Sequence, residues 1–428
     1  MNYDRFYCNY IVTFLRTDRK GERIMKRRSV LFSVLALLLV GVLLFGACAT
    51  NDPAPPPASP APAPTTPADP APQETDEPED QGPIDWANFR IDPALIPQEK
   101  LDTELHIAVS IRGLGNPYYV TKFEGMQMFS DWLTSIGQNH ATPQILDSGG
   151  SNDTEISNMR TFSVAAGGNA IVYVDPNEAA NAPALAEAIA EGGGFMGTAW
   201  SKPDGIGPMD FTPNWVVHTS ADNFTGGYNT ARLLFESMGG EGDVFVIEGM
   251  LGNTAAIDRR RGFDAALESF PGINVAHQDS GNWATSEALI LAETWLTVTP
   301  DVGGIWAAND NMAFGAIQAL TNAGLQGQVG VTGIDATDDM VQAVRDGHAV
   351  ATVSSNGFLQ SSFTLAIAYA VWTGLLDIDQ LPIEYREFFT PSVLVTADNV
   401  EEFVAIFIDS APEFDFTNPF YAKASPMN

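Results

Sequence analysis

The stretch from Gly304 to Ala323, GIWAANDNMAFGAIQALTNA, contains the pattern that decides the fold. Its first five residues form a short apolar run suited to a buried strand, and apolar residues from Met312 onward recur at helical spacing. The polar pair Asn309-Asp310 separates the two parts. A buried strand that leads directly into an amphipathic helix is the repeating unit of parallel α/β sheets.

The same pattern recurs on both sides of this stretch. We expect strands at residues 106–111, 170–174, 195–200, 243–248, 304–308, 329–334 and 349–354. We expect helices at residues 117–136, 183–191, 259–267, 312–323, 340–345 and 358–373. Alternating strands and helices predict parallel sheets with helices on both faces, and a chain of this length with so many strands predicts two similar lobes.

Polar and aromatic residues follow several of the expected strands. In open parallel sheets, ligands bind at the carboxyl ends of strands, so these positions are the candidate site. The segments are Asn116–Tyr119, Asp258–Phe263, Asp279–Trp283, Asn309-Asp310 and Asp335. Aromatic rings cover the C–H faces of a ring-shaped ligand, while charged and amide groups bind its hydroxyls. The set therefore indicates a small polyhydroxylated ligand.

Five segments, in order along residues 104–390, resemble the type I periplasmic solute-binding proteins of the ribose-binding kind, which serve ABC importers. They are Asn116-Pro-Tyr-Tyr119, Ser220-Ala-Asp-Asn223 with Gly226-Gly227, Arg259-Arg-Arg-Gly-Phe263, Asn309-Asp-Asn-Met-Ala313 and Gly333-Ile-Asp335. The resemblance implies an α/β fold of two lobes, each a parallel sheet between helices, joined by a three-segment hinge. It places the first lobe at residues 84–221 and 357–385, and the second at 222–356 and 386–428.

The resemblance also implies roles for single residues. Asn116 would hydrogen-bond the ligand, and Tyr118 and Tyr119 would stack on it from the first lobe. Core packing is the alternative for Tyr118. The residues expected to complete the site from the second lobe are Trp283, over the opposite ligand face, and Arg259, Asn309 and Asp335, on its hydroxyls. Asp310 is expected to cap the helix that follows it.

Two positions depart from the resemblance. Trp200 follows the fourth strand, where the pentose binders have a charged Asp-Arg pair; it either adds a stacking face or is buried. Ser355 lies near the last crossing, where glutamine is common, and is retained as a candidate ligand contact. Fewer charged groups and more aromatic area favour a ligand that is larger or less polar than a free pentose.

The N-terminal region has the layout of a bacterial lipoprotein signal. Basic residues 26–28 precede an apolar run at 30–47, and Cys48 follows directly after a pair of small residues. We expect residues 25–47 to be the signal peptide, Cys48 to be the lipidation site and residues 1–24 to be a doubtful extension. An uncleaved signal anchor is the alternative. Residues 48–83, rich in Pro, Ala, Asp and Glu, predict a disordered stalk.

Composition excludes several classes of function. With 53 acidic and 21 basic residues, a net charge of −32 disfavours nucleic-acid partners. The five histidines are far apart, so we expect no metal and no cofactor. Without a Gly-x-Ser-x-Gly or zinc motif, we expect no enzyme activity. We expect a monomeric lipoprotein on the outer face of the cell membrane that delivers solute to an ABC permease, or else presents its closed state to a membrane receptor or kinase.

Overall fold

The computed structural model describes residues 84–409 and 414–427. The predictions for residues 1–24, for the signal peptide at 25–47, for Cys48 and for the stalk up to residue 83 lie outside this part of the chain. Among the described helices, none combines the length and the apolar character that crossing a membrane requires.

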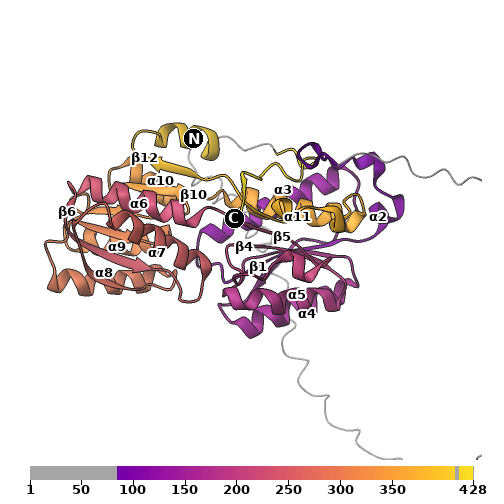
Figure 1. Ribbon diagram of the computed structural model, residues 1–428, viewed down its shortest axis with the longest axis horizontal. Coiled ribbons are helices and arrows are strands. Elements are labelled where there is room, and N and C mark those ends of the chain that lie inside the picture. Colours follow the sequence, from indigo (N-terminus) through magenta and orange to yellow (C-terminus); the bar gives the residue numbers. More distant parts are fainter. Residues whose placement is uncertain (1–83, 410–413, 428) are drawn as a thin grey trace, which may run out of the picture. The chain divides into compact units, whose positions relative to one another are not determined.

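The first lobe is built on a seven-stranded sheet with the order β13-β11-β5-β4-β3-β1-β2 (Figure 1). Its strands are β1 (His106–Ile111), β2 (Gln144–Asp147), β3 (Ala170–Val174), β4 (Phe195–Ala199), β5 (Trp215–Ser220), β11 (Glu387–Phe389) and β13 (Ser425–Pro426). All pairings are parallel except that of β13 with β11. Strands β1, β3, β4 and β5 are almost wholly buried, because helices cover both faces of the sheet.

Two pairs of helices cover the first sheet. On one face lie α3 (Tyr118–Ser135) and α11 (Gly357–Thr373), and on the other α4 (Asn152–Ala166) and α5 (Ala182–Glu191) (Figure 1). Helix α11 is buried almost all round, because it packs against α3 and against β3, β4 and β5. The lobe also contains the short helices α2 (Gln98–Asp102), α12 (Ile383–Arg386), η2 (Trp86–Asn88), η3 (Pro93–Leu95), η4 (Ala179–Asn181), η5 (Pro208–Phe211) and η6 (Ile378–Gln380).

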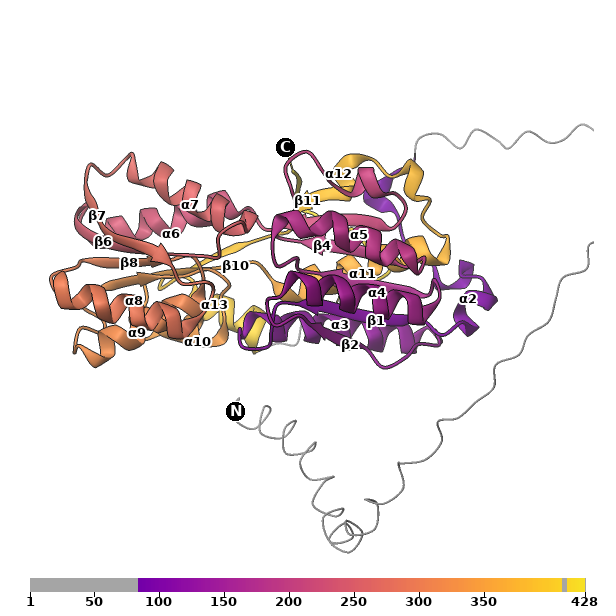
Figure 2. The same cartoon turned by 90° about the horizontal axis from the view of Figure 1, so that it is seen from below.

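The second lobe is built on a six-stranded sheet with the order β12-β10-β9-β8-β6-β7. Its strands are β6 (Glu241–Glu248), β7 (Gly272–Ser280), β8 (Gly304–Ala307), β9 (Gly330–Thr332), β10 (Ala351–Ser354) and the antiparallel β12 (Val393–Thr396). Helices α6 (Asn223–Ser237) and α7 (Thr254–Leu267) lie on one side, and α8 (Thr285–Val298) and α9 (Asp310–Asn322) on the other (Figure 2). Helices α10 (Asp338–Arg345) and α13 (Val400–Phe403), with the π-helix η7 (Val404–Ile408), complete it.

Several helices begin at side chains that accept hydrogen bonds from their first backbone N–H groups. Asn253 accepts a hydrogen bond from Ala256 N, Asn309 from Met312 N and Asn356 from Leu359 N. The expected cap at Asp310 is therefore wrong, because Asn309 occupies the cap position and Asp310 is already helical. These caps directly follow strands or short loops, so they lie at the carboxyl ends of the sheets.

The chain passes from one lobe to the other within residues 220–223, 354–357 and 389–393, and we call these three segments the crossings. It returns to the first lobe once more between Asp409 and Phe414. The two lobes confirm the predicted fold class. The assignment of residues 386–428 to the second lobe is wrong in part, because β11 and β13 pair within the first sheet. The C-terminal segment also packs there, with Phe416 and Phe420 buried in the first-lobe core and the Thr417 carbonyl accepting a hydrogen bond from Ile91 N.

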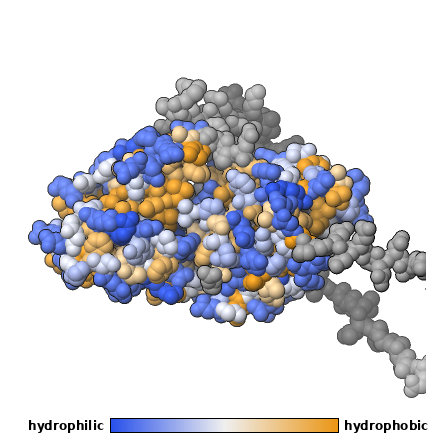
Figure 3. Space-filling model, turned by 45° about the horizontal axis from the view of Figure 1, so that its top comes forward, coloured by the Kyte–Doolittle hydropathy of each residue, from blue (hydrophilic) through white to orange (hydrophobic). Residues whose placement is uncertain are grey.

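The surface agrees with the acidic composition. On the face shown in Figure 3, hydrophilic residues surround several smaller hydrophobic areas. Exposed large apolar side chains such as Leu251 and Val298 are common on soluble proteins, since polar atoms alone cannot cover a folded chain.

Candidate functional site

A pocket lies between the two lobes at the carboxyl ends of the parallel strands. It encloses about 370 Å³ of space between its walls, part of which is open to solvent. Each lobe contributes half of its wall. The lining residues are Arg112, Asn116, Tyr118, Tyr119, Asp175 and Trp200 from the first lobe, and Asn253, Ala255, Arg259, Trp283, Asn309 and Asp335 from the second.

The first-lobe wall is mainly aromatic. The carboxamide oxygen of Asn116 accepts a hydrogen bond from Tyr118 N at 3.0 Å and fixes the start of α3. The Tyr118 ring lies 6.3 Å from that of Tyr119 and 5.8 Å from that of Trp200, which it meets edge to face. Burial raises the pKa of both tyrosines, so their neutral hydroxyls can donate as well as accept hydrogen bonds.

Two charged groups in this wall were not among the predicted site residues. Asp175 directly follows β3 and lines the pocket beside Tyr119. Burial raises the pKa of Asp175, while nearby Arg112 and Lys122 oppose the shift. Arg112 directly follows β1 and donates from Nη2 to the carbonyl of Asn177 at 2.7 Å. The strand-end rule applied to residues 170–174 would have identified Asp175.

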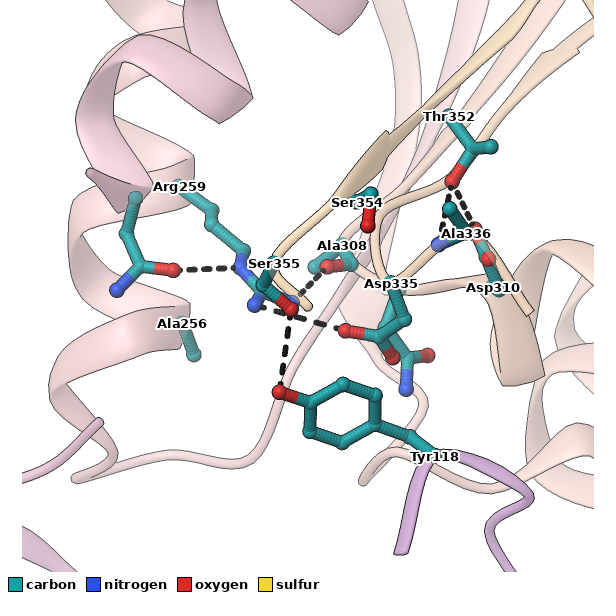
Figure 4. Close-up of polar contacts among 12 residues, drawn as sticks. Tyr118, Ala256, Arg259, Ala308, Asp310, Asp335, Ala336, Thr352, Ser354 and Ser355 are labelled. Carbon is teal, nitrogen blue, oxygen red and sulfur yellow. Dashed lines mark hydrogen bonds and ion pairs between the residues drawn. The ribbon is translucent and has the colours of Figure 1, made fainter. Parts of the chain in front are cut away.

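The second-lobe wall is organised around Arg259, which is 3% exposed. Its Nε donates to Asn223 Oδ1 at 2.9 Å and its Nη1 to the Ala308 carbonyl at 2.7 Å. Its Nη2 lies 3.8 Å from Asp335 Oδ1, so the guanidinium has partners on all sides. Figure 4 shows this side chain reaching from α7 toward Ala308 and Asp335. Such a set of acceptors orients a buried guanidinium firmly.

Two indole rings from opposite lobes lie beside the same guanidinium. The Arg259 Cζ atom is 5.1 Å from the ring centroid of Trp200 and 5.6 Å from that of Trp283. Both distances are within the range of cation–π attraction. From the sequence, Trp200 was expected either to add a stacking face or to be buried. It does both, because it lines the pocket and is 5% exposed.

Burial governs the carboxylates of the second lobe. It raises the pKa of Asp335, and Arg259 opposes that shift. Behind Asp335, the Asp310 carboxylate accepts hydrogen bonds from Thr352 Oγ1 at 2.7 Å and Thr337 N at 2.8 Å (Figure 4). Asp310 thus supports the pocket from outside its wall, whereas Asp335 faces the pocket.

Three residues of the wall have backbone conformations that side chains rarely adopt. The φ angles are +67° at Trp200, +63° at Trp283 and +139° at Asp335. Such strain is concentrated at functional sites, because the surrounding structure must hold it. Gly249 makes one of these placements possible, since a Cβ atom there would lie 2.1 Å from Cη2 of Trp283.

The structure brings the predicted site residues together. Eight of the nine predicted contacts line the pocket. The ninth, Ser355, does not; its hydroxyl donates to the Tyr118 hydroxyl at 3.1 Å from outside. Sequence reasoning missed Arg112, Asp175, Asn253 and Ala255 as lining residues. Among residues 84–409 and 414–427, no group of three or more His, Cys, Asp or Glu side chains could hold a metal ion.

Comparison with known proteins places this geometry in a family. The model of the periplasmic binding protein domain matches residues 107–375. The xylitol-binding protein of Mycolicibacterium smegmatis is 32% identical over 44% of this chain and 52% of its own length. The ribose import binding protein of Haemophilus influenzae is 28% identical over 65% of this chain and 90% of its own length.

A solved structure agrees with the sequence relatives. The twin-arginine translocation pathway signal protein from Burkholderia phytofirmans is 35% identical, with a TM-score of 0.72 over 76% of this chain and 99% of that one. Together, these matches span both lobes and the pocket between them. The chain belongs to the periplasmic binding protein family, whose members bind solutes and are not enzymes.

Proposed function

We propose that this protein captures a sugar or sugar-like solute between its two lobes and delivers it to an ABC import permease, while a lipid on Cys48 holds it at the outer face of the cell membrane. The pocket is the observation that carries solute capture. Aromatic rings, two carboxylates and two guanidinium groups meet there, six residues from each lobe. A ligand that bridges both walls stabilises the closed state through its differential affinity.

Unsatisfied polar atoms of the wall support a hydroxylated ligand. The buried Trp200 Nε1 and Arg112 Nε have no hydrogen-bond partner among the described residues. Buried donors of this kind cost free energy unless an acceptor reaches them. A sugar hydroxyl or ring oxygen supplies such an acceptor, and its ring presents C–H faces to the aromatic side chains.

The relatives favour the same class of solute. By their names, two of them bind xylitol and ribose, a polyol and a pentose. The pocket uses neutral tyrosines and nearly balanced charges, with Arg112 and Arg259 facing Asp175 and Asp335. Such a wall suits an uncharged polyhydroxylated molecule, because each carboxylate can accept two hydroxyl hydrogens.

A thermal-shift screen tests solute capture. The chain from Pro78 onward is a compact unit and is suitable for it. We would screen D-ribose, D-allose, xylitol, other polyols, disaccharides and nucleosides. A solute that binds only the folded state adds about 2.7 kcal/mol at one hundred times its dissociation constant, so its melting temperature must rise. No shift with any of them would refute sugar capture.

Matched variants locate the binding site. Asp335→Asn removes a pocket carboxylate with little change in volume, and Trp283→Ala removes an aromatic face. Both should abolish the shift. Asp301→Asn changes an exposed carboxylate of the same lobe and should leave the shift intact. Equal losses in all three variants would contradict binding in the pocket.

Substitution of the two cysteines of the chain tests the proposed lipid anchor. Replacing Cys48 by Ser removes the proposed acceptor, whereas Cys8→Ser changes the only other cysteine of the chain. In cells fed a labelled fatty acid, we expect Cys48→Ser alone to abolish labelling and release the protein from the membrane fraction. Labelling that survives this change would exclude Cys48 as the anchor.

A further inference from the structure

Lys122 on α3 is a buried cation outside the pocket wall. It is 0% exposed, and no carboxylate oxygen of the described residues lies within 4.0 Å of its Nζ atom. Instead, Nζ donates to the hydroxyl of Tyr118 at 2.6 Å and to Oε1 of Gln360. The faces of Tyr118, Tyr173 and Trp200 surround it at 4.4, 5.2 and 5.7 Å. An ammonium group in such a place costs stability unless it does something that an apolar side chain cannot.

The partners of Lys122 reach two of the crossings directly. The Tyr118 hydroxyl accepts a hydrogen bond from Ser355 Oγ at 3.1 Å, in the crossing at 354–357 (Figure 4). It also donates to Gln360 Oε1 at 3.0 Å. Gln360 Nε2 donates at 3.4 Å to Thr390 Oγ1, in the crossing at 389–393.

The third crossing joins the same network and returns to the pocket. Thr390 N donates to the Ser220 carbonyl at 2.7 Å, and Asn223 Nδ2 donates to Ser220 Oγ at 3.0 Å. Asn223 Oδ1 in turn accepts from Arg259 Nε. The three crossings therefore connect, through hydrogen bonds, a pocket tyrosine in one lobe to the pocket arginine in the other.

We propose that Lys122 is a positioning residue for solute binding: its ammonium group holds the Tyr118 hydroxyl against the crossings, so that the pocket and the hinge share one fixed side chain. The proposal rests on the function proposed above. Among the described residues, Lys122 and Ser355 are the two groups that donate to the Tyr118 hydroxyl. Without the ammonium group, the ring keeps its packing but loses the stronger, charge-assisted of these two bonds.

The charge of Lys122 depends on several groups around it. Burial lowers its pKa to about 7, and the carboxylates of Asp175 and Asp335 oppose that shift. Tyr118 and Tyr173 stay neutral, because burial raises the pKa of each. Arg259 lies across the pocket and is the remaining cation of the network.

The test compares Lys122→Met, Tyr118→Phe and the double variant in the chain from Pro78. This part of the chain contains no cysteine, so Ser157→Cys and Thr297→Cys place one spin label on an exposed site of each lobe. The distance distribution between the labels reports hinge opening without any sugar. We expect both single variants to broaden it, and the double variant to broaden it by less than the sum of the two, because both changes remove the bond between Lys122 and Tyr118.

A control and a second measurement complete the design. Lys100→Met removes a lysine that lies 4.4 Å from the ring of Trp372 in the same lobe, and it should leave the distribution unchanged. For a sugar that shifts the parent, such as D-ribose, Lys122→Met should weaken binding about tenfold, as expected for a hydrogen bond to a charged group.

The outcomes separate this proposal from the function on which it rests. An unchanged distribution in Lys122→Met, or additive broadening in the double variant, would overturn the positioning role even if sugars bind. Broadening in the single variants without a bound sugar would support the role even if the panel of solutes fails.

Discussion

Two buried cations of the molecule, Arg259 in the second lobe and Lys122 in the first, are held in different ways. Arg259 has an amide oxygen, a backbone carbonyl and the carboxylate of Asp335 as partners. Lys122 has two neutral oxygens, from Tyr118 and Gln360, and aromatic faces. The first cation belongs to an ion pair, whereas the second depends on neutral groups.

The two cations also differ in how their charge depends on pH. A guanidinium remains charged at any pH that the protein meets, and its fork of donors fixes several acceptors at once. The ammonium of Lys122 has a pKa of about 7, so its charge changes near neutrality. Arg259 is therefore a constant charge in the second-lobe wall, whereas Lys122, behind the first-lobe wall, has a charge that responds to its surroundings.

Replacing each cation by methionine tests this comparison with the largest expected effect. Above pH 8, where Asp335 is ionised, Arg259→Met leaves its carboxylate without a cation, and breaking a buried pair in this way costs about 3–5 kcal/mol of unfolding free energy. Lys122→Met removes a buried ammonium that has no carboxylate within ion-pair distance, so we expect no loss of melting temperature. Urea unfolding of the two variants measures both effects.

The matched control for Arg259→Met is Arg261→Met on the same helix. Arg261 pairs with Asp258 at the surface, with 69% of its side chain exposed, so its removal should change stability little. If Arg259→Met were as stable as this control, the partners of Arg259 would not contribute as the geometry implies.

A methyl group at Gly249 changes the surroundings of Arg259 and leaves those of Lys122 unchanged. It would meet the Trp283 indole at 2.1 Å, and the indole would have to leave its place beside Arg259. We expect Gly249→Ala to cost about 1–3 kcal/mol, as overpacking does, and to weaken binding of any solute found in the screen. Gly115→Ala, where a Cβ would have open space and, as at Gly249, φ is not positive, is the control without a clash.

Much of the fold and site could be predicted because both follow from local patterns. Buried strands such as residues 304–307 end in polar residues, and Asn309 and Asp335 lie in the pocket for that reason. Strand β7 escaped prediction because it lies at the edge of its sheet and is only partly buried, which mixes its apolar and polar residues. The strain at Trp283 also has no local signal.

The burial of Lys122 is the clearest example of a feature that could not be predicted from the sequence. A lysine within an amphipathic helix predicts a solvated position. It is buried because α11 packs on α3, and its partner Gln360 lies 238 residues away along the chain. The crossings bring Ser220, Ser355 and Thr390 together only after both lobes have formed. Contacts of this kind depend on the complete topology, so no segment of the sequence could reveal them.

Opposite pH dependences give the finest test of the comparison. Burial raises the pKa of Asp335 from 3.8 to about 8, so the folded state binds more protons than the unfolded state between those values. Its contribution to stability is therefore present below pH 4 and is lost as the pH rises toward 8. Burial lowers the pKa of Lys122 from 10.5 to about 7, so the folded state binds fewer protons, and stability rises between pH 7 and 10.5.

Melting temperatures of the parent, Asp335→Asn and Lys122→Met from pH 4 to pH 10 separate these two contributions. Half-buried Glu124 and buried Glu155 also have raised pKa values of about 7, but they are present in all three proteins. The differences between curves therefore report the replaced group together with its charge interactions, including that of Asp335 with Asp310. Asp335→Asn should flatten the fall below pH 8, and Lys122→Met should remove the rise above pH 7. If both variants altered the same part of the curve, Asp335 and Lys122 would titrate as one unit. The contrast between Arg259, which is paired with Asp335, and Lys122, which has only neutral partners, would then be wrong.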